Sequence, residues 1–416
     1  MTDKSMPRRL RVLMSAYACE PGKGSEPGIG WNLAKAMAKR HDVWVLTRAN
    51  NRPAIEAELA ERPVPNLDFL YYDLPRWARW WKRGGRGVQL YYYLWQFSAI
   101  NTARKAHKKE KFDIAQHVTF KKYWAPSAAA FIGAPFVWGP VGGGESMPKS
   151  FFHDLSLKSR IYERFRSMVR RIGESDPFVL TTARRANVAI ATTKETSERI
   201  QSMAKLSTVE GMIGDCMVPE EFVLGNSRKE PKKERTITFI SSGRFLGWKG
   251  YHLSIRAFAE LALENSRYIL LGDGPEKNHL QKLAKELSIE KQIEFIGSIS
   301  RGEVIKRLSS ADIFVHPSLH DSGGWATLEA MASGLPVICL DIGGPAVQVN
   351  SSVGRKIPAI NPSQTIKDLT ESMRELASNH DLRRRLGEAA KDHVFSEFTW
   401  EKEVEQLSKI YDQVLS

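Results

Sequence analysis

The chain has 416 residues, too many for one ordinary hydrophobic core, so we expect two domains. Hydrophobic residues make up 42% and charged residues 26%, which excludes a disordered chain, and no apolar run approaches the roughly 20 residues of a membrane-spanning helix. The formal charge of +14 favours anionic partners, whether nucleic acid, anionic lipid or phosphorylated small molecules.

The cysteines and the first residues bear on the compartment. Three scattered cysteines without a CxxC or Cys/His cluster imply neither a disulfide framework nor a zinc site, and they fit a reducing cytoplasm. Basic residues precede an apolar run near the N-terminus, as in a secretory signal. That run is short and a glycine-rich turn follows it directly, so we interpret residues 10–17 as a buried first strand.

Short apolar runs alternate with helical patterns along the chain, which predicts two parallel α/β sheets. The runs are residues 10–17, 43–47, 114–118, 136–138, 188–191, 237–240, 268–271, 293–296, 313–316 and 337–340. Residues 227–235 are charged and contain a proline, which predicts a linker between domains at 1–226 and 236–395. Residues 396–416 have apolar side chains at helical spacing and predict an amphipathic closing helix.

A glycine-rich turn follows the first predicted strand, at the end of a strand where parallel sheets bind ligands. Gly22, Gly24 and Gly28 have the spacing GxGxxxG, and no acid follows the second strand, so a nicotinamide or flavin site is weakly indicated. Such a turn binds phosphate in some proteins and merely connects strand and helix in others. Both interpretations stay open on this motif alone.

Two further features of the first half lie after predicted strands. His117 ends the third apolar run and is expected to point toward a ligand, although a packed, hydrogen-bonded histidine fits equally well. Gly142, Gly143 and Gly144 precede Glu145, and three consecutive glycines indicate unusual torsions or close backbone approach. A flexible loop is the alternative.

The loop after the first strand of the second half places two cations near one another. Arg244 and Lys249, with Gly247 and Gly250 between and after them, predict an anion clamp rather than two solvated surface cations. Downstream, Gly274 lies in the turn GDGP, which suits a loop beside a nucleotide base, although turn chemistry alone also explains it.

A strand, a loop and a helix then carry the sequence HDSGGWATLE. Gly323 and Gly324 let backbone amides approach a ligand at the helix N-terminus, beside Trp325. Asp321 and, eight positions later, Glu329 are acids suited to the hydroxyl groups of a sugar and a ribose. Helix capping is the alternative, and it explains neither the second acid nor the paired glycines well.

These motifs, in this order, resemble the retaining family-4 glycosyltransferases of the GT-B fold, over almost the whole chain. The likeness is strongest in SGRFLGWKGYHLSIRAF, LLGDGPEKNHL, IEFIGSIS and HPSLHDSGGWATLEAMASGLPVICLDIGG. It implies two Rossmann-like parallel-sheet domains facing across a cleft, with a C-terminal helix that crosses back to the first domain. The family has two glutamates eight residues apart, and here Asp321 replaces the first of them.

The resemblance also implies roles for single residues. Arg244 and Lys249 correspond to the pair that holds the donor diphosphate. Glu329 corresponds to the acid on the nucleotide ribose, Asp321 to the acid facing the donor sugar, and His117 to the first-domain histidine near that sugar. The expected catalytic residues are His117, Asp321, Arg244 and Lys249, and the remaining donor-binding set is Gly24, Ser25, Glu26, Gly274, Gly323, Gly324, Trp325 and Glu329.

The expected activity is that of a retaining, metal-independent hexosyl- or glycosyltransferase with no cofactor beyond its donor, a UDP- or GDP-sugar. The acceptor would be a lipid-linked or other saccharide in bacterial surface polysaccharide or glycolipid synthesis, and the stretch GPVGGGE resembles such enzymes. The alternatives are a nucleotide-sugar epimerase or phosphorylase on the same fold, and a catalytically inactive membrane-binding homologue.

Two basic segments with aromatic residues, 76–97 and 150–174, suit an anionic membrane surface. We expect residues 150–174 to form one amphipathic helix. Its apolar stripe is Phe151, Leu155, Ile161, Phe165, Met168 and Ile172, and its cations are Arg160, Arg164, Arg166, Arg170 and Arg171. The hypothesis is a cytoplasmic protein attached peripherally to the inner face of the plasma membrane; core helices with solvated charged faces are the alternative. The sequence contains no recognisable nucleic-acid module, so no nucleic-acid partner is expected.

Overall fold

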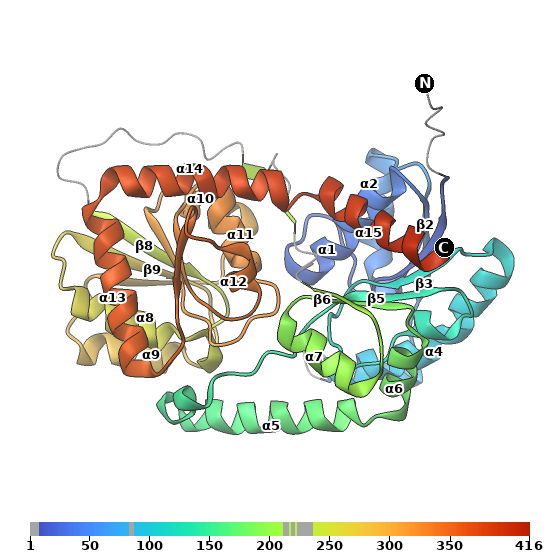
Figure 1. The fold of residues 1–416 in the computed structure, drawn as a ribbon, viewed down its shortest axis with the longest axis horizontal. Coiled ribbons are helices and arrows are strands. Elements are labelled where there is room, and N and C mark those ends of the chain that lie inside the picture. The colour runs from blue at the N-terminus through green and yellow to red at the C-terminus, as the bar shows by residue number, and fades with distance from the viewer. Residues whose placement is uncertain (1–7, 83–86, 211–215, 218–220, 223–235) are drawn as a thin grey trace. The chain divides into compact units, whose positions relative to one another are not determined.

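The computed structural model describes residues 8–82, 87–210, 216–217, 221–222 and 236–416. They divide into two compact units (Figure 1). The first holds the described residues of Met1–Gly144, Val169–Gly214 and Trp400–Ser416, and the second those of Glu145–Met168 and Asp215–Thr399.

The first unit is built on a seven-stranded parallel sheet with the order β3-β2-β1-β4-β5-β6-β7. Its strands are β1 Arg11–Ser15, β2 Asp42–Arg48, β3 Leu67–Tyr72, β4 Ile114–His117, β5 Phe136–Val141, β6 Val188–Ala191 and β7 Thr208–Glu210. Its helices are α1 Ser25–Ala38, α2 Arg52–Glu61, α3 Arg76–Arg79, α4 Val88–Glu110, α6 Pro177–Arg185, α7 Lys194–Met203 and α15 Trp400–Leu415. The central strand β1 pairs with β2 and β4, and its Val12 is aligned with Val43 and Ile114.

The second unit has a six-stranded parallel sheet with the order β10-β9-β8-β11-β12-β13. Its strands are β8 Ile237–Ser242, β9 Ser266–Leu271, β10 Ile293–Gly297, β11 Ile313–His316, β12 Val337–Leu340 and β13 Gly354–Ile357. Its helices are α8 Tyr251–Leu261, α9 Lys277–Glu286, α10 Arg301–Ser309, α11 Trp325–Ala332, α12 Gly343–Gln348, α13 Pro362–Ser378 and α14 His380–Glu397. Because the strands are parallel, the loops that follow them lie together at the carboxyl edge of the sheet. The strand order turns back between β8 and β11, the point at which such sheets bind ligands.

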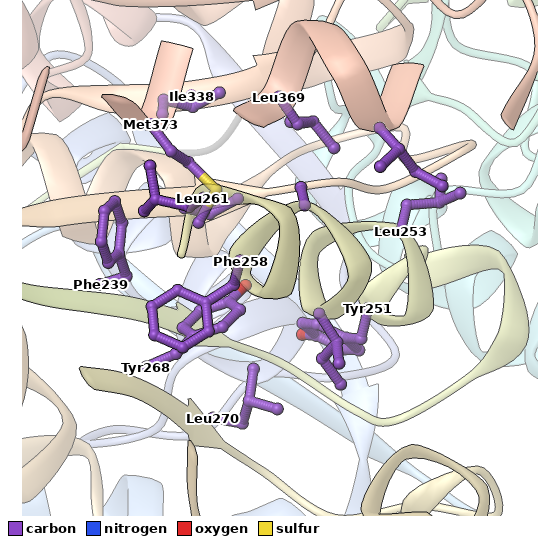
Figure 2. Packing of buried hydrophobic residues seen from close by; sticks show 14 of the residues in the cluster. Phe239, Tyr251, Leu253, Phe258, Leu261, Tyr268, Leu270, Ile338, Leu369 and Met373 are labelled. Carbon is purple, nitrogen blue, oxygen red and sulfur yellow. The ribbon is translucent and has the colours of Figure 1, made fainter. Parts of the chain in front are cut away.

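A dense aromatic and aliphatic core holds helix α8 onto this sheet (Figure 2). Phe258 of α8 packs edge-on against Phe239 of β8, with ring centroids 5.7 Å apart, and close to Tyr268 of β9. The buried Tyr268 hydroxyl lies 2.6 Å from Ser241 Oγ and 2.9 Å from Ser254 Oγ. Burial of each large apolar side chain stabilises the fold by about 1.5–3 kcal/mol, so this core fixes the start of α8 beside the strand ends.

The predicted α/β organisation is confirmed, and each of the ten predicted apolar runs contributes to a strand. Residues 10–17 contain β1, a buried strand in the middle of its sheet. The prediction missed β3, β7 and β13, which all lie at sheet edges. Edge strands are partly solvated and often short or charged, as in TVE and GRKI, so they give no continuous apolar run.

The C-terminal helix α15 returns to the first unit, as the sequence predicted. The Tyr411 hydroxyl donates to Oε1 of the buried Gln116 on β4. Ser408 Oγ lies 3.0 Å from His41 Nε2, just before β2. Because the helix is amphipathic, it buries its apolar face against α1 while its charged face stays in solvent.

The units differ from the expected division mainly over residues 145–168, which pack with the second unit rather than with residues 1–144. Residues 216–217, 221–222 and 396–399 also belong to the second unit. Phe151 and Leu155 are buried in the second core. Asp154 Oδ1 accepts from Arg256 Nη1 at 2.8 Å, and its Oδ2 lies 2.9 Å from His252 Nε2. The predicted linker, residues 227–235, lies outside the described residues.

The single amphipathic helix expected over residues 150–174 is also corrected. A 3-10 turn covers Lys149–Asp154, and α5 begins separately at Leu157 and ends at Glu174. The predicted stripe therefore divides into two parts. Its first two members, in and after the turn, are buried, whereas Ile161, Phe165, Met168 and Ile172 on α5 are exposed.

The substitution Asp154→Asn tests the attachment of residues 145–168. Although burial raises the pKa of Asp154, its contacts with His252 and Arg256 lower it to about 2. A depressed carboxyl pKa stabilises the fold above the unfolded value, near 4, and this contribution is lost as the pH falls toward 2. We expect the variant to lose about 2 kcal/mol of unfolding free energy at pH 7, with a smaller difference from wild type at pH 3, by urea titration.

The matched control is Asp381→Asn, because this acid is almost fully exposed. It should leave the unfolding free energy within about 0.5 kcal/mol of wild type. Equal effects of the two substitutions would contradict the attachment.

Candidate functional site

A cavity of about 640 Å³ opens at the carboxyl ends of β8, β9 and β10, within the second unit. Its lining residues come from the three loops that follow these strands and from α10: Ser242, Gly243, Arg244, Leu271, Gly272, Asp273, Gly274, Gly297, Ser298, Ile299 and Val304. The volume falls in the range of small-molecule sites, roughly 300–1,000 Å³.

Tight backbone packing beside Arg244 shapes this cavity. A Cβ atom at Gly272, where φ is +136°, would lie 2.0 Å from the carbonyl oxygen of Gly243. One at Gly274 would lie 2.4 Å from the carbonyl oxygen of Phe245. Side chains are therefore excluded at these turns, and the exposed Arg244 is the cationic side chain among the residues that line the cavity.

Lys249 and Asp321, predicted to serve the diphosphate and the donor sugar, are in contact with each other. Lys249 Nζ donates to Asp321 Oδ2, and His316 Nε2 lies 3.1 Å from the same oxygen. Lys249 ends a 3-10 turn, Gly247–Lys249, and Asp321 follows β11. A Cβ atom at Gly250 would lie 1.9 Å from the carbonyl oxygen of Pro317, so the two loops touch through their backbones.

The charges in this group follow from burial and pairing. Burial raises the pKa of Asp321, but Lys249 and His316 outweigh it and hold the carboxyl pKa well below its usual range. Burial lowers the pKa of His316, against the opposing effect of Asp321. At neutral pH the group is therefore a carboxylate between an ammonium and a neutral imidazole.

Glu329 lies one turn inside α11 in a second charged group. Its Oε1 accepts from Trp325 Nε1 at 2.7 Å and also from Arg301 Nη1. Arg301 Nη2 in turn donates to Glu221 Oε2 at 2.5 Å. Burial raises the pKa of Glu329 despite these contacts. Arg301 begins α10, the helix that also supplies Val304 to the cavity.

The paired glycines before α11 bring two backbone segments together. The carbonyl oxygen of Gly323 accepts from Gln348 Nε2 at 2.7 Å, and the amide of Gly344 donates to the carbonyl oxygen of Asp321 at 2.7 Å. Gly324 is the N-cap residue of α11 and has φ +91°, in the left-handed region. The glycines thus hold the Asp321 loop against α12, in addition to any role toward a ligand.

In the first unit, the predicted residues gather around the segment after β4. Both carboxylate oxygens of Glu26 accept backbone amide hydrogens, from Phe120 at 2.8 Å and from Lys121 at 3.2 Å. Glu26 lies in the first turn of α1, which begins at Ser25 after the cap residue Gly24. The carboxylate therefore connects the glycine turn to the segment that follows His117.

His117 is buried at the end of β4. Its Nδ1 lies 3.1 Å from Ser127 Oγ. Burial lowers its pKa to about 4, against the opposing effect of a backbone hydrogen bond at Phe120. The imidazole is therefore neutral at physiological pH, which limits it to hydrogen bonding rather than to charge stabilisation.

Two of the three glycines at residues 142–144 meet their neighbours at close range, as the sequence indicated. A Cβ atom at Gly143 would lie 2.4 Å from the Trp124 ring, and one at Gly144 would lie 2.5 Å from Thr196 Cα. Glu145, which follows them, is buried in the second unit, and its Oε2 accepts from Ser322 Oγ at 2.5 Å.

The structure thus brings the predicted site residues into four groups. Arg244 and Gly274 line the cavity, Lys249 contacts Asp321, Glu329 contacts Trp325, and Glu26 holds the segment after His117. Reasoning from the sequence missed His316, Ser322 and Arg301. His316 ends a predicted strand and Arg301 begins a helix after another, and these positions at strand ends were the available signal.

Residues 225–393 match the family described as Glycosyl transferases group 1. The D-inositol 3-phosphate glycosyltransferase of Corynebacterium jeikeium is 31% identical over 201 residues, 45% of this chain and 46% of that protein. The N-acetyl-alpha-D-glucosaminyl L-malate synthase of Bacillus anthracis is 28% identical over 53% of this chain and 57% of that protein. The chain spans about half the length of these curated relatives.

Solved structures match along nearly the whole chain. A glycosyltransferase from Rickettsia africae has a TM-score of 0.64 at 16% identity, covering 98% of this chain and 99% of that one. HepE of Anabaena in complex with UDP-glucose has a TM-score of 0.60 at 16% identity, covering 97% and 100%. The catalytic domain of Arabidopsis thaliana starch synthase IV, bound to ADP and acarbose, has a TM-score of 0.65 at 12% identity, covering 98% and 100%.

The chain therefore has the GT-B fold, and the match to the glycosyl transferase group 1 family lies within its second half. The matching residues contain all four strand-end loops from which the cavity and the two charged groups are built.

The contact between Gly250 and Pro317 predicts a stability effect. In Gly250→Ala, the alanine would have to adopt the left-handed backbone conformation at φ +67°, and its Cβ would overlap the Pro317 carbonyl oxygen. We expect a loss of about 2 kcal/mol or more in unfolding free energy, because the loops that carry Lys249 and Asp321 must separate. Thermal or urea unfolding measures it.

Gly302→Ala is the matched control, because a Cβ atom at Gly302 in α10 would meet nothing within 4 Å. That substitution should leave stability unchanged or raise it slightly, as alanine favours helix. A harmless Gly250→Ala would refute the close approach of the two loops.

Proposed function

We propose that the chain is a retaining, metal-independent glycosyltransferase that moves a sugar from a UDP- or GDP-sugar to a saccharide or lipid-linked acceptor in bacterial surface polysaccharide or glycolipid synthesis. One observation carries the proposal. The cavity lined by Arg244 and closely packed glycines opens at the carboxyl edge of the second sheet. The segments that follow the strands at this edge also carry the Lys249–Asp321 and Arg301–Glu329 pairs.

The charges suit the two sides of a glycosyl–diphosphate bond. Cleavage places negative charge on the diphosphate, where Arg244 and Lys249 would stabilise it by preorganised electrostatics. It places positive charge on the sugar ring, which the Asp321 carboxylate would face. A front-face transfer follows, in which the leaving phosphate removes the acceptor proton, so no second carboxylate is required as base.

The remaining predicted residues have supporting roles in this proposal. Glu329, oriented by Trp325 and Arg301, would accept hydroxyl hydrogens from the nucleotide ribose. Gly274, Gly323 and Gly324 would let the donor approach the backbone. In the first unit, neutral His117 would serve the transfer by hydrogen bonding, and Glu26 would hold the turn of Gly24 and Ser25 against the segment that follows this histidine.

The similar proteins support the donor class. One relative is named a D-inositol 3-phosphate glycosyltransferase and another an N-acetyl-alpha-D-glucosaminyl L-malate synthase. Of the solved structures of this fold, one holds UDP-glucose and another holds ADP. A nucleoside diphosphate is therefore the ligand class that the site is proposed to take. A comparison of nucleotides by thermal unfolding identifies the base.

The proposed setting is the inner face of the plasma membrane, with attachment through residues 76–97 and 150–174. Trp77 and Trp80 are 79% and 74% exposed. Trp77 lies on α3, which begins and ends with an arginine, and Trp80 directly follows that helix. Other aromatic residues of the first segment, Tyr91 and Trp95, are buried core residues instead. Of the described helices, none is apolar over a length sufficient to cross a bilayer.

Arg244→Ala tests the diphosphate clamp. Thermal unfolding of the wild type with UDP, GDP, ADP, CMP and NAD, each in EDTA, should show a rise in midpoint of several degrees with one nucleoside diphosphate. A ligand at about 100 times its Kd adds roughly 2.7 kcal/mol. Arg244→Ala should abolish that rise and reduce transfer by about a hundredfold or more, because a charged ligand contact is lost.

Arg384→Ala, which removes an exposed arginine on α14, should keep both the thermal shift and the turnover. Full activity of Arg244→Ala would refute the clamp. Donor turnover without acceptor would favour an epimerase, and product formation with free phosphate would favour a phosphorylase. No shift with any nucleotide would favour the catalytically inactive homologue.

A further inference from the structure

Helix α5 carries its apolar residues outward. Within the second unit, the large side chains along one stripe are exposed by half or more: Leu157 69%, Ile161 59%, Phe165 57% and Met168 50%. These positions lie on one face at helical spacing. An ordinary surface helix buries such a stripe, so these residues forgo much of the stabilisation that burial would give them.

The opposite face of α5 is polar and packs inward. Ser159 is buried and donates to Glu276 Oε1 at 2.9 Å. Its Oγ would lie 2.3 Å from a Cβ atom at Gly247, so glycine there admits α5 to the turn that carries Lys249. Glu163 is also buried and lies 3.2 Å from His320 Nε2 through its Oε1. The outward direction of the apolar stripe is therefore fixed by specific contacts of the polar face.

The charges beside the stripe identify the kind of surface that it fits. Lys158 and Arg164 are exposed on either side of it, and Arg160 is half-buried. Arg164 also stacks over the Phe152 ring at 5.2 Å. An apolar stripe bordered by cations is the pattern of helices that lie in the headgroup region of anionic bilayers. With a chain charge of +14, an anionic membrane is favoured over an acidic protein groove.

The same helix also reaches the residues next to the charged pair, through the partly exposed Tyr162. The Tyr162 ring stacks on Trp248, with centroids 5.0 Å apart, and Trp248 stacks on His320 at 5.0 Å. Trp248 precedes Lys249, and His320 precedes Asp321. One turn of α5 thus contacts both loops whose cation and carboxylate meet.

A second contact holds the other side of Asp321. Arg166 of α5 donates to the carbonyl oxygen of Glu145 at 3.3 Å, and the Glu145 carboxylate accepts from Ser322 Oγ. Asp321 is therefore flanked by two residues that residues 145–168 hold in place. A restraint on α5 becomes a restraint on this loop.

We propose that the outward face of α5 docks on an anionic membrane surface. The docked helix then restrains the loops of the donor site through Glu163 on its inward face. The coupling rests on the proposed function. A docked helix moves less, so the loops of Lys249 and Asp321 lose less conformational entropy when a nucleoside diphosphate binds. Glu163 is thus a positioning residue, which acts on the site through His320.

Docking is tested by co-sedimentation of the full chain with vesicles of phosphatidylcholine containing 30% phosphatidylglycerol. Ile161→Asp places a charge in the stripe and should weaken vesicle binding about tenfold or more. Ile360→Asp is the matched control, because Ile360 is also 59% exposed but lies outside α5. It should bind nearly as wild type does. Equal binding by both variants, or no preference for anionic vesicles, would overturn the docking.

Coupling is tested by the affinity for UDP and for GDP with and without these vesicles. The wild type should bind one of them several-fold more tightly on vesicles. Glu163→Ala should reduce that ratio toward one while it keeps vesicle binding, and Glu163→Gln, which retains an acceptor for His320, should largely restore it. Circular dichroism and the unfolding midpoint check that each variant folds.

The outcomes separate the two proposals. A wild-type ratio of one, or an unchanged ratio in Glu163→Ala, would overturn the coupling. Absence of nucleotide binding in both conditions would overturn the proposed function and the coupling with it, whereas the comparison of Ile161→Asp with Ile360→Asp decides the docking independently.

Discussion

The ion pair between Lys249 and Asp321 joins two loops that lie 72 positions apart in the chain. Burial alone would disfavour the Asp321 carboxylate, so the pair persists because Lys249 and His316 compensate for the lost hydration. The surrounding backbone is arranged to allow it. Gly250 lets one loop touch Pro317, and Gly343, where a Cβ would lie 2.1 Å from the Asp321 carbonyl oxygen, lets α12 support the other. The site depends on this contact because it fixes where a cation and an anion stand at the edge of the sheet.

Much of this arrangement is predictable from the sequence, because it follows from topology. Parallel strands end at one edge of a sheet, and Arg244, Gly274 and Asp321 each follow a predicted strand, so the sequence places all three at that edge. Which of them meet is a different matter. The contact between Lys249 and Asp321, like that between Arg301 and Glu329, depends on the paths of two loops and on side-chain rotamers. No spacing in the sequence encodes these.

Helix α5 shows a second limit to what a sequence pattern can predict. Its period correctly indicates an amphipathic helix, but period alone does not say which face the fold buries. The usual expectation places the apolar face inward, and here the inward face is polar because Glu163 and Ser159 have buried partners in His320 and Glu276. The same partners explain why residues 145–168 pack with the second unit, against the expected boundary. Edge strands such as β13 were missed for a related reason, since their charged residues face solvent.

The most direct test of the proposed donor site is a crystal structure of the full chain with UDP or GDP, whichever stabilises it. We predict that the nucleotide occupies the cavity beside Gly272 and Gly274. Its diphosphate should lie within hydrogen-bonding distance, about 2.7–3.0 Å, of Arg244 and Lys249, with the ribose hydroxyls on Glu329. A nucleotide bound elsewhere on the chain, or a diphosphate that contacts neither cation, would contradict it.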